Sequence, residues 1–166
     1  HNFTGAAAVL RGGSFTGRAG THAYGISNDG SGATLAAESV TALGENGSNS
    51  NRGLLNQHVA TATLRGGTFT GRGGPFTWGI HNNISPATVE AESVTALGED
   101  GSSGNYGLRN ENSATANVTQ GVLEGATYSV VRSSGTVTLS NSRLVGGVSG
   151  TTANLGADRC GRTEPC

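Results

Sequence analysis

Three glutamates are the residues of this chain whose types and spacing come closest to a catalytic set. Glu90 and Glu92 alternate along one short segment, so both point to the same side of an extended strand. Glu38 is the equivalent of Glu92 in an earlier copy of the same sequence. Carboxylates about 5–9 Å apart carry out glycoside hydrolysis. A solvated strand face explains the same glutamates, and the chain's three Asp residues lie at unrelated positions. We therefore predict no catalytic residues and no enzyme.

Metal, cofactor and nucleic-acid sites are not indicated either. The four histidines, His1, His22, His58 and His81, fall at different positions of the repeated sequence, so they form no ligand set. The net charge of −1 gives no basic face for nucleic acid. No apolar run approaches the ~20 residues that a transmembrane helix needs, so we expect no membrane insertion.

The strongest pattern in the sequence is a gapless 54-residue repeat, in which the stretch 10–57 returns as the stretch 64–111. More than half of the aligned positions are identical in the two copies. A shorter period lies inside the repeat, because Tyr-Gly-Ile-Ser-Asn at positions 24–28 returns in related form from positions 52, 78 and 106. A short unit that cannot bury its own apolar face, stacked on copies of itself, indicates a solenoid.

Between these units run short segments in which apolar and polar side chains alternate, each closed by Gly, Asn or Ser. This pattern predicts short strands joined by turns, three strands to a coil, and no helix. The sequence divides into about five parallel coils of 22–28 residues. They start at Tyr24, Arg52, Trp78, Tyr106 and Tyr128, after a partial first coil.

The stacked Gly-Ile/Leu-x-Asn units and the stretch from Ser134 to Gly150 resemble the right-handed parallel β-helix proteins of the pectate-lyase-like superfamily, in their bacterial secreted or surface form. The resemblance covers nearly the whole chain and implies an all-β, right-handed parallel β-helix. It says less about function, because one fold carries many activities.

Two columns of equivalent residues should form when the coils stack. Asn28, Asn56, Asn82 and Asn110 are expected to bond through their amides from coil to coil, and this ladder should stop at Arg132. The second column contains Tyr24, Trp78, Tyr106 and Tyr128, with Arg52 among them. It is either a stack at the edge of the core or a stripe on which a ligand stacks. Strand parity places Tyr24 on the same face as Ile26, which favours partial burial.

The C-terminal tail, residues 151–166, follows the solenoid of residues 1–150 and holds both cysteines, Cys160 and Cys166. Their separation, with Gly and Pro between them, allows a small loop, so we predict a disulfide and an oxidising compartment. Half of a zinc site is the alternative, although no His lies nearby. The first residue, His1, indicates a processed chain. Four sequons begin at Asn2, Asn46, Asn83 and Asn117, and their glycosylation depends on the host.

These features predict a secreted or surface-displayed structural subunit of an extracellular fibre, sheath or adhesive appendage. Its chain opens inside a coil without a covering helix, so the expected partner is a second copy, stacked head to tail into a filament. Cell-surface or environmental glycans are further candidate partners. The alternative is a carbohydrate-binding or polysaccharide-degrading fragment of a tailspike-like protein.

A minor alternative is an ice-binding protein, which would need Thr columns across successive coils. Thr61 and Thr63 fit such columns, as do Thr136 and Thr138. Four residues are expected to interrupt them: Leu35, Ala36, Val89 and Glu90.

Overall fold

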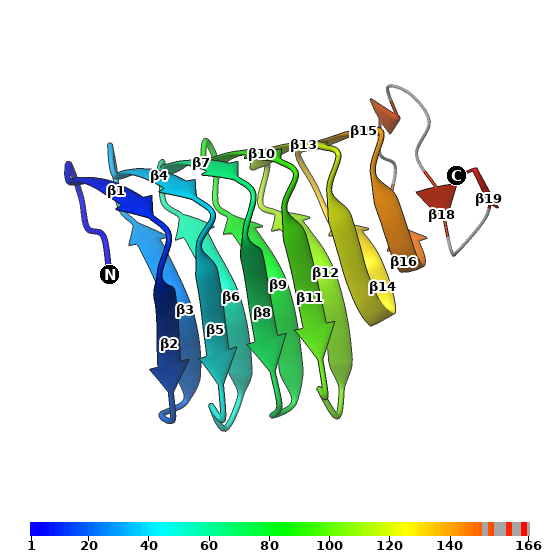
Figure 1. The fold of residues 1–166 in the computed structure, drawn as a ribbon, viewed down its shortest axis with the longest axis horizontal. Helices are drawn as coiled ribbons and strands as arrows, with labels where there is room; N and C mark the ends of the chain where they lie inside the picture. The colour runs from blue at the N-terminus through cyan, green and yellow to red at the C-terminus, as the bar shows by residue number, and fades with distance from the viewer. Residues whose placement is uncertain (151–152, 155–158, 161–163, 166) are drawn as a thin grey trace.

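The computed structural model describes residues 1–150, 153–154, 159–160 and 164–165. It is an all-β parallel solenoid of about four regular turns, and the coils advance steadily from the N-terminus to the C-terminal side (Figure 1). Direct neighbours on successive strands are Ala7, Thr34, Thr61, Thr88 and Thr115, so the residue number advances by 27 with each regular turn. The predicted parallel solenoid is therefore confirmed.

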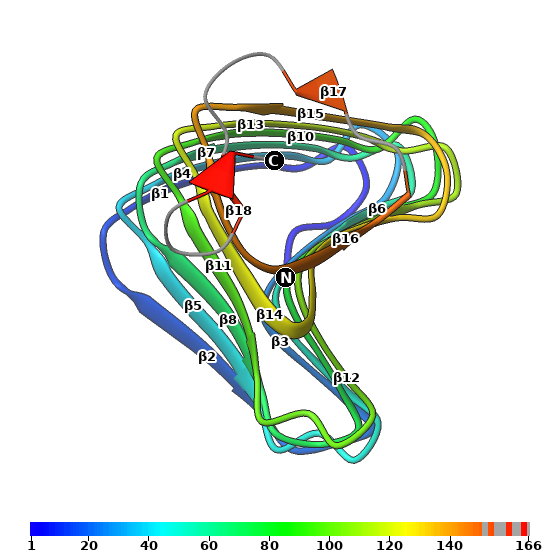
Figure 2. The same cartoon turned by 90° about the vertical axis from the view of Figure 1, so that its right-hand side faces the viewer.

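Three strands make each regular coil, and each strand forms one side of a triangular cross-section (Figure 2). The strands of the first face are β1 (Ala7–Arg11), β4 (Thr34–Glu38), β7 (Thr61–Arg65), β10 (Thr88–Glu92), β13 (Thr115–Thr119), β15 (Thr136–Ser140) and β17 (Ala153–Asn154). Those of the second face are β2 (Ser14–Arg18), β5 (Thr41–Glu45), β8 (Thr68–Arg72) and β11 (Thr95–Glu99). Those of the third face are β3 (His22–Asp29), β6 (Ser50–Gln57), β9 (Phe76–Asn83) and β12 (Gly104–Glu111).

The fifth coil departs from the regular form. A continuous strand, β14 (Val122–Arg132), replaces the two strands of the second and third faces and pairs with both β11 and β12. It turns before reaching the tip where the other coils end (Figure 2). The sequence-based count of five comparable coils is thus corrected to about four regular turns and two shorter ones, β13–β14 and β15 with β16 (Arg143–Ser149), which pairs along β14. The remaining strands are β18 (Arg159–Cys160) and β19 (Glu164–Pro165).

Each corner between the first and second faces is made by a residue with a left-handed backbone. Gly12, Ser39, Gly66 and Ser93 occupy this corner in the four regular coils, with φ between 53° and 64°. Glycine adopts this conformation without steric cost, and a small side chain adopts it at modest cost. Because the same corner recurs at the same place in every coil, the strands stay in register from one coil to the next.

The core explains why the sequence repeats over two coils rather than one. On the first face, Leu35 and Ala37 of one coil lie beside Ala62 and Leu64 of the next, so the large side chain alternates between two inward positions. Phe69, fully buried, pairs with Ala42 and Ala96 on its two sides. Alternating large and small side chains lets neighbouring layers interlock at native density.

Toward the tip of the cross-section, the second and third faces meet backbone to backbone, forming a thin edge here called the blade (Figure 2). Glycine columns line both inner surfaces. A Cβ atom on Gly98 of β11 would lie 2.5 Å from the Tyr106 carbonyl oxygen, and one on Gly79 of β9 would lie 2.5 Å from the Ala96 carbonyl carbon. Sheets that face each other through side chains lie about 10 Å apart, so this approach requires glycine. The other members of the columns are Gly17, Gly44, Gly71 and Gly125, and Gly25, Gly53 and Gly107.

Candidate ligand-binding site

The predicted asparagine ladder is present, and it is longer than predicted. Asn28, Asn56, Asn82 and Asn110 are fully buried, and the amide nitrogen of each of the first three donates to the Oδ1 of the next over 2.8–2.9 Å. Asn2 adds a fifth member by donating to Asn28 over 2.7 Å.

The same amides also bond backbone carbonyls of the adjoining turns. Asn82, for example, donates to the Thr115 carbonyl at 2.7 Å. The ladder ends as expected at Arg132, which lies beside Asn110 and donates to the Gly135 carbonyl instead. Its role is structural, because the amides close each turn and tie it to the next coil.

The aromatic column also forms, on the outer side of the third face. Its rings stack along the solenoid axis. Trp78 lies 6.0 Å from Tyr106, and Tyr106 lies 6.4 Å from Tyr128. The Arg52 guanidinium fills the gap in the stack, 5.2 Å from the Tyr24 ring and 4.4 Å from the Trp78 ring. Neighbours therefore cover the ring faces within the column.

Strand parity gave the wrong side for Tyr24. Ile26 belongs to the apolar core, whereas Tyr24 stacks with Arg52 on the outer side. The cause is Gly25. A Cβ atom added to Gly25 would point inward, toward the backbone of Leu43, so Gly25 and Ile26 both face inward. Two consecutive inward residues shift the alternation, as a β-bulge does.

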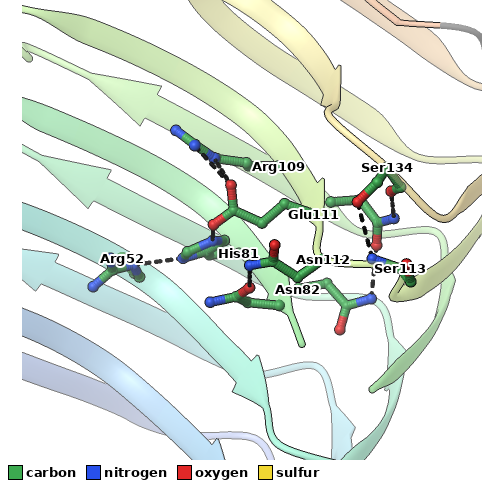
Figure 3. Close-up of polar contacts among 10 residues, drawn as sticks. Arg52, His81, Asn82, Arg109, Glu111, Asn112, Ser113 and Ser134 are labelled. Atoms are coloured by element: carbon green, nitrogen blue, oxygen red, sulfur yellow. Dashed lines mark hydrogen bonds and ion pairs between the residues drawn. The ribbon is translucent and has the colours of Figure 1, made fainter. Parts of the chain in front are cut away.

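Beside the aromatic column lies a polar cluster, here called the His81 cluster, which comprises Arg52, His81, Arg109 and Glu111 (Figure 3). The Arg52 Nε donates to His81 Nδ1 over 2.9 Å, and His81 Nε2 lies 2.7 Å from Glu111 Oε1. Arg109 binds the other Glu111 oxygen through Nε and Nη2, both at 2.7 Å. Strands β6, β9 and β12 bring these residues together from three successive coils.

The hydrogen bonds fix the protonation state of the imidazole. Since His81 Nδ1 accepts from Arg52, the proton of a neutral ring must be on Nε2, which donates to Glu111. Burial lowers the pKa of His81, because the charged ring would lose its hydration, and the two neighbouring arginines add to this effect. Burial likewise lowers the pKa of Arg52 below its ordinary value.

Glu111 is held in its ionised form. The hydrogen bond from His81, followed by the charge and hydrogen bond of Arg109, lowers the pKa of Glu111 to about 2, although burial opposes the shift. Both nitrogens of His81 and both oxygens of Glu111 thus take part in hydrogen bonds within the cluster.

The cluster borders a cavity of about 250 Å³, lined by its four residues together with Phe76 and Trp78. Trp78 stacks on the His81 ring at 5.3 Å, and the Arg109 guanidinium lies 5.8 Å from the indole. The indole Nε1 is buried and has no hydrogen-bond partner among the described residues. The cavity therefore combines aromatic walls and two guanidinium groups.

The glutamates singled out as catalytic candidates lie elsewhere, on the exposed outer side of the first face. Arg65 stands between Glu38 and Glu92 in the register, and Glu90 accepts a hydrogen bond from Asn117 over 2.8 Å. The structure therefore separates Glu38 from Glu92 by a basic side chain rather than joining them into a carboxylate pair.

The threonines partly form the column that ice binding would need. Thr34, Thr61, Thr88 and Thr115 follow one another on the first face, and Thr136 continues the column. Leu35 and Val89, expected to interrupt it, belong to the core instead. The neighbouring outward column does not consist of threonine, since its members are Val9, Ala36, Thr63, Glu90, Asn117 and Thr138. A flat array of paired Thr columns is therefore not formed on this face.

The predicted disulfide falls outside the described part of the chain. Cys166 is not among the described residues, and only the backbone of Cys160 is described, in β18. The pairing stays a prediction. Of the sequon asparagines, Asn2 is buried in the ladder, whereas Asn46 is exposed.

His81, Arg109 and Glu111 were not predicted as a site. A signal for them was nevertheless present in the sequence. The first 54-residue copy has Ser27 where the second has His81, Leu55 where it has Arg109, and Gln57 where it has Glu111.

Among the described residues, no group of three or more His, Cys, Asp or Glu side chains could hold a metal ion. In the same part of the chain, no helix is long and apolar enough to span a membrane. In comparisons with known proteins, no family model, curated protein or solved structure matches this chain.

Proposed function

We propose that this chain is a structural subunit of an extracellular fibre, sheath or adhesive appendage whose copies stack head to tail. The observation that carries the proposal is the equivalence of the coils. The residue pairs between β1 and β4 recur between β4 and β7 and between β7 and β10, always in the same register. A coil with this outline fits on any other coil, so the surface that stacks within the chain also suits stacking between chains.

The first coil supports this view. Its inward residues Ala8, Leu10 and Phe15 pack against the core yet remain only partly buried, whereas Leu35 and Ala42 of the second coil are fully buried. A further coil on that side would bury the three residues and pair the open edges of β1 and β2. In our proposal, a second copy of the chain supplies it. The six layers from β1 to β15 would advance the filament by roughly 29 Å, at ~4.8 Å per layer.

The secreted or surface location is part of the same proposal, and so is the right-handed winding that the resemblance to pectate-lyase-like proteins implies. No catalytic role is proposed. The outer first face, with its alternating Arg and Glu side chains, supports a rod-like subunit, because interspersed charges of both signs keep lateral surfaces soluble.

Sedimentation velocity over a range of concentrations, followed by negative-stain imaging, tests the proposal. We expect the chain to form linear assemblies. Leu10→Glu places a charge on the proposed contact and should leave monomers, whereas Thr34→Glu, on the exposed outer face, should assemble as the parent does. A compact monomer at every concentration would overturn the proposal, and so would assembly unaffected by Leu10→Glu.

A further inference from the structure

Among the outward strand positions, the differences between the two 54-residue copies concentrate on one surface. The outward positions of β3 and β6 are 22, 24, 27, 29, 50, 52, 55 and 57, and all eight differ from their counterparts in the second copy. On the other two faces, the outward positions of β2, β4 and β5 differ at only two of nine, positions 14 and 36. The outer third face therefore varies, whereas the outward positions of the other two faces are repeated almost unchanged.

This comparison shows that the His81 cluster is not needed to build a coil. In the first copy, Ser27, Leu55 and Gln57 stand at the positions of His81, Arg109 and Glu111, and the strands that carry them pair in the same register. Arg109 and His81 lose part of their hydration on this surface, which costs free energy. The first copy, with Leu55 and Ser27 at these positions, avoids part of that cost. Polar clusters of this kind, beyond the needs of the fold, are found where proteins bind ligands.

The charges of the cluster indicate which ligands the cavity would take. Glu111 is neutralised by the guanidinium fork of Arg109, and His81 is neutral in its observed hydrogen bonding. Arg52 then leaves the site with one positive charge in excess. Its Nε is bound to His81 and the guanidinium also bonds the Tyr24 side chain, so the remaining N–H groups of its terminal nitrogens are the donors for an oxyanion. Phe76 and Trp78 add apolar walls at the same cavity.

We propose that the cavity bordered by the His81 cluster binds a small organic carboxylate. The guanidinium groups of Arg52 and Arg109 contact the carboxylate, and the rings of Phe76 and Trp78 contact the body of the ligand. This site does not depend on filament formation, so the two proposals can fail separately.

The chain contains one tryptophan, Trp78, so fluorescence excited at wavelengths beyond the tyrosine absorption band reports on this cavity. We would titrate the protein with sodium benzoate and, separately, with sodium galacturonate, to distinguish an aromatic acid from an acidic sugar. Benzamide and galactose are the matched neutral compounds. We expect a saturable change with at least one of the carboxylates, at least tenfold weaker binding of its neutral partner, and weaker binding at higher salt.

The chain itself supplies the matched variant. Replacing three residues by their counterparts in the first copy gives His81→Ser/Arg109→Leu/Glu111→Gln. This variant should keep the circular dichroism spectrum of the parent and bind the carboxylate at least tenfold more weakly. Arg72→Leu, on the second face, should bind as the parent does. No saturable change with either carboxylate would overturn the proposal, as would equal binding of the neutral compounds or undiminished binding by a folded triple variant.

Discussion

The glycine columns of the blade give the sharpest test of the fold. A Cβ atom on Gly71 would lie 2.5 Å from the carbonyl oxygen of Trp78 and 2.6 Å from its backbone nitrogen. Non-bonded heavy atoms are most stable at about 3.5–4.0 Å, so Gly71→Ala requires the two sheets to separate by about 1 Å. The obstructing atoms are backbone, so no rotamer change can relieve the contact.

Inserting a methyl group into a well-packed core costs roughly 1–3 kcal/mol. We expect Gly71→Ala to cost about 3 kcal/mol, because the clash is with backbone and Gly71 lies between further coils on both sides. For a chain of this length, this corresponds to a fall in Tm of about 6–12 °C, at ~2–4 °C per kcal/mol. Urea and thermal unfolding followed by circular dichroism would measure both quantities.

Gly147→Ala is the matched control. Gly147 is an exposed glycine in β16. An added Cβ would lie 3.1 Å from the ring of Tyr128, whose side chain is itself 37% exposed and can move, and at an ordinary contact distance of 3.7 Å from the Thr127 carbonyl oxygen. We expect a change within about 0.5 kcal/mol. If Gly71→Ala were as stable as Gly147→Ala, the close approach of the two sheets, and with it the explanation for the glycine columns, would be wrong.

Three further predictions concern the polar residues. The pKa of His81 is lowered in the folded state, so its contribution to stability is complete above the unfolded pKa of about 6.5 and is lost as the pH falls below it. The pKa of Glu111 is lowered to about 2, so its contribution is lost between about pH 4.5 and 2. Tm measured against pH should thus fall on acidification in both windows, and His81→Ser should remove the first decline. Asn82→Ala removes a fully buried rung of the ladder and should destabilise the chain by about 2–4 kcal/mol in urea, because it leaves buried carbonyls unpaired. Intact-mass measurement after alkylation, with and without reductant, should show Cys160 and Cys166 paired, and two free thiols in fresh protein would contradict the pairing.

The repeat alone was enough to predict the fold class, the three-strand coil and the asparagine ladder. In a parallel solenoid, residues at equivalent positions of successive coils become neighbours, so sequence periodicity translates directly into contacts. Asn28 and Asn56 could be placed together for that reason. Asn2 was missed as a rung because the coil that holds it lacks the Gly-Ile-x-Asn unit by which the others were recognised.

Other features depended on three-dimensional contacts that no periodicity encodes. The inward turn at Gly25 reverses the side predicted for Tyr24, because alternation fails where two consecutive residues face the same way. The shortened fifth coil follows from the single continuous strand β14. The His81 cluster arises only when β6, β9 and β12 lie side by side, since its hydrogen bonds join residues from three different coils. The sequence by itself thus determined which positions stack, whereas the tertiary structure decided which side each one faces and which charges it meets there.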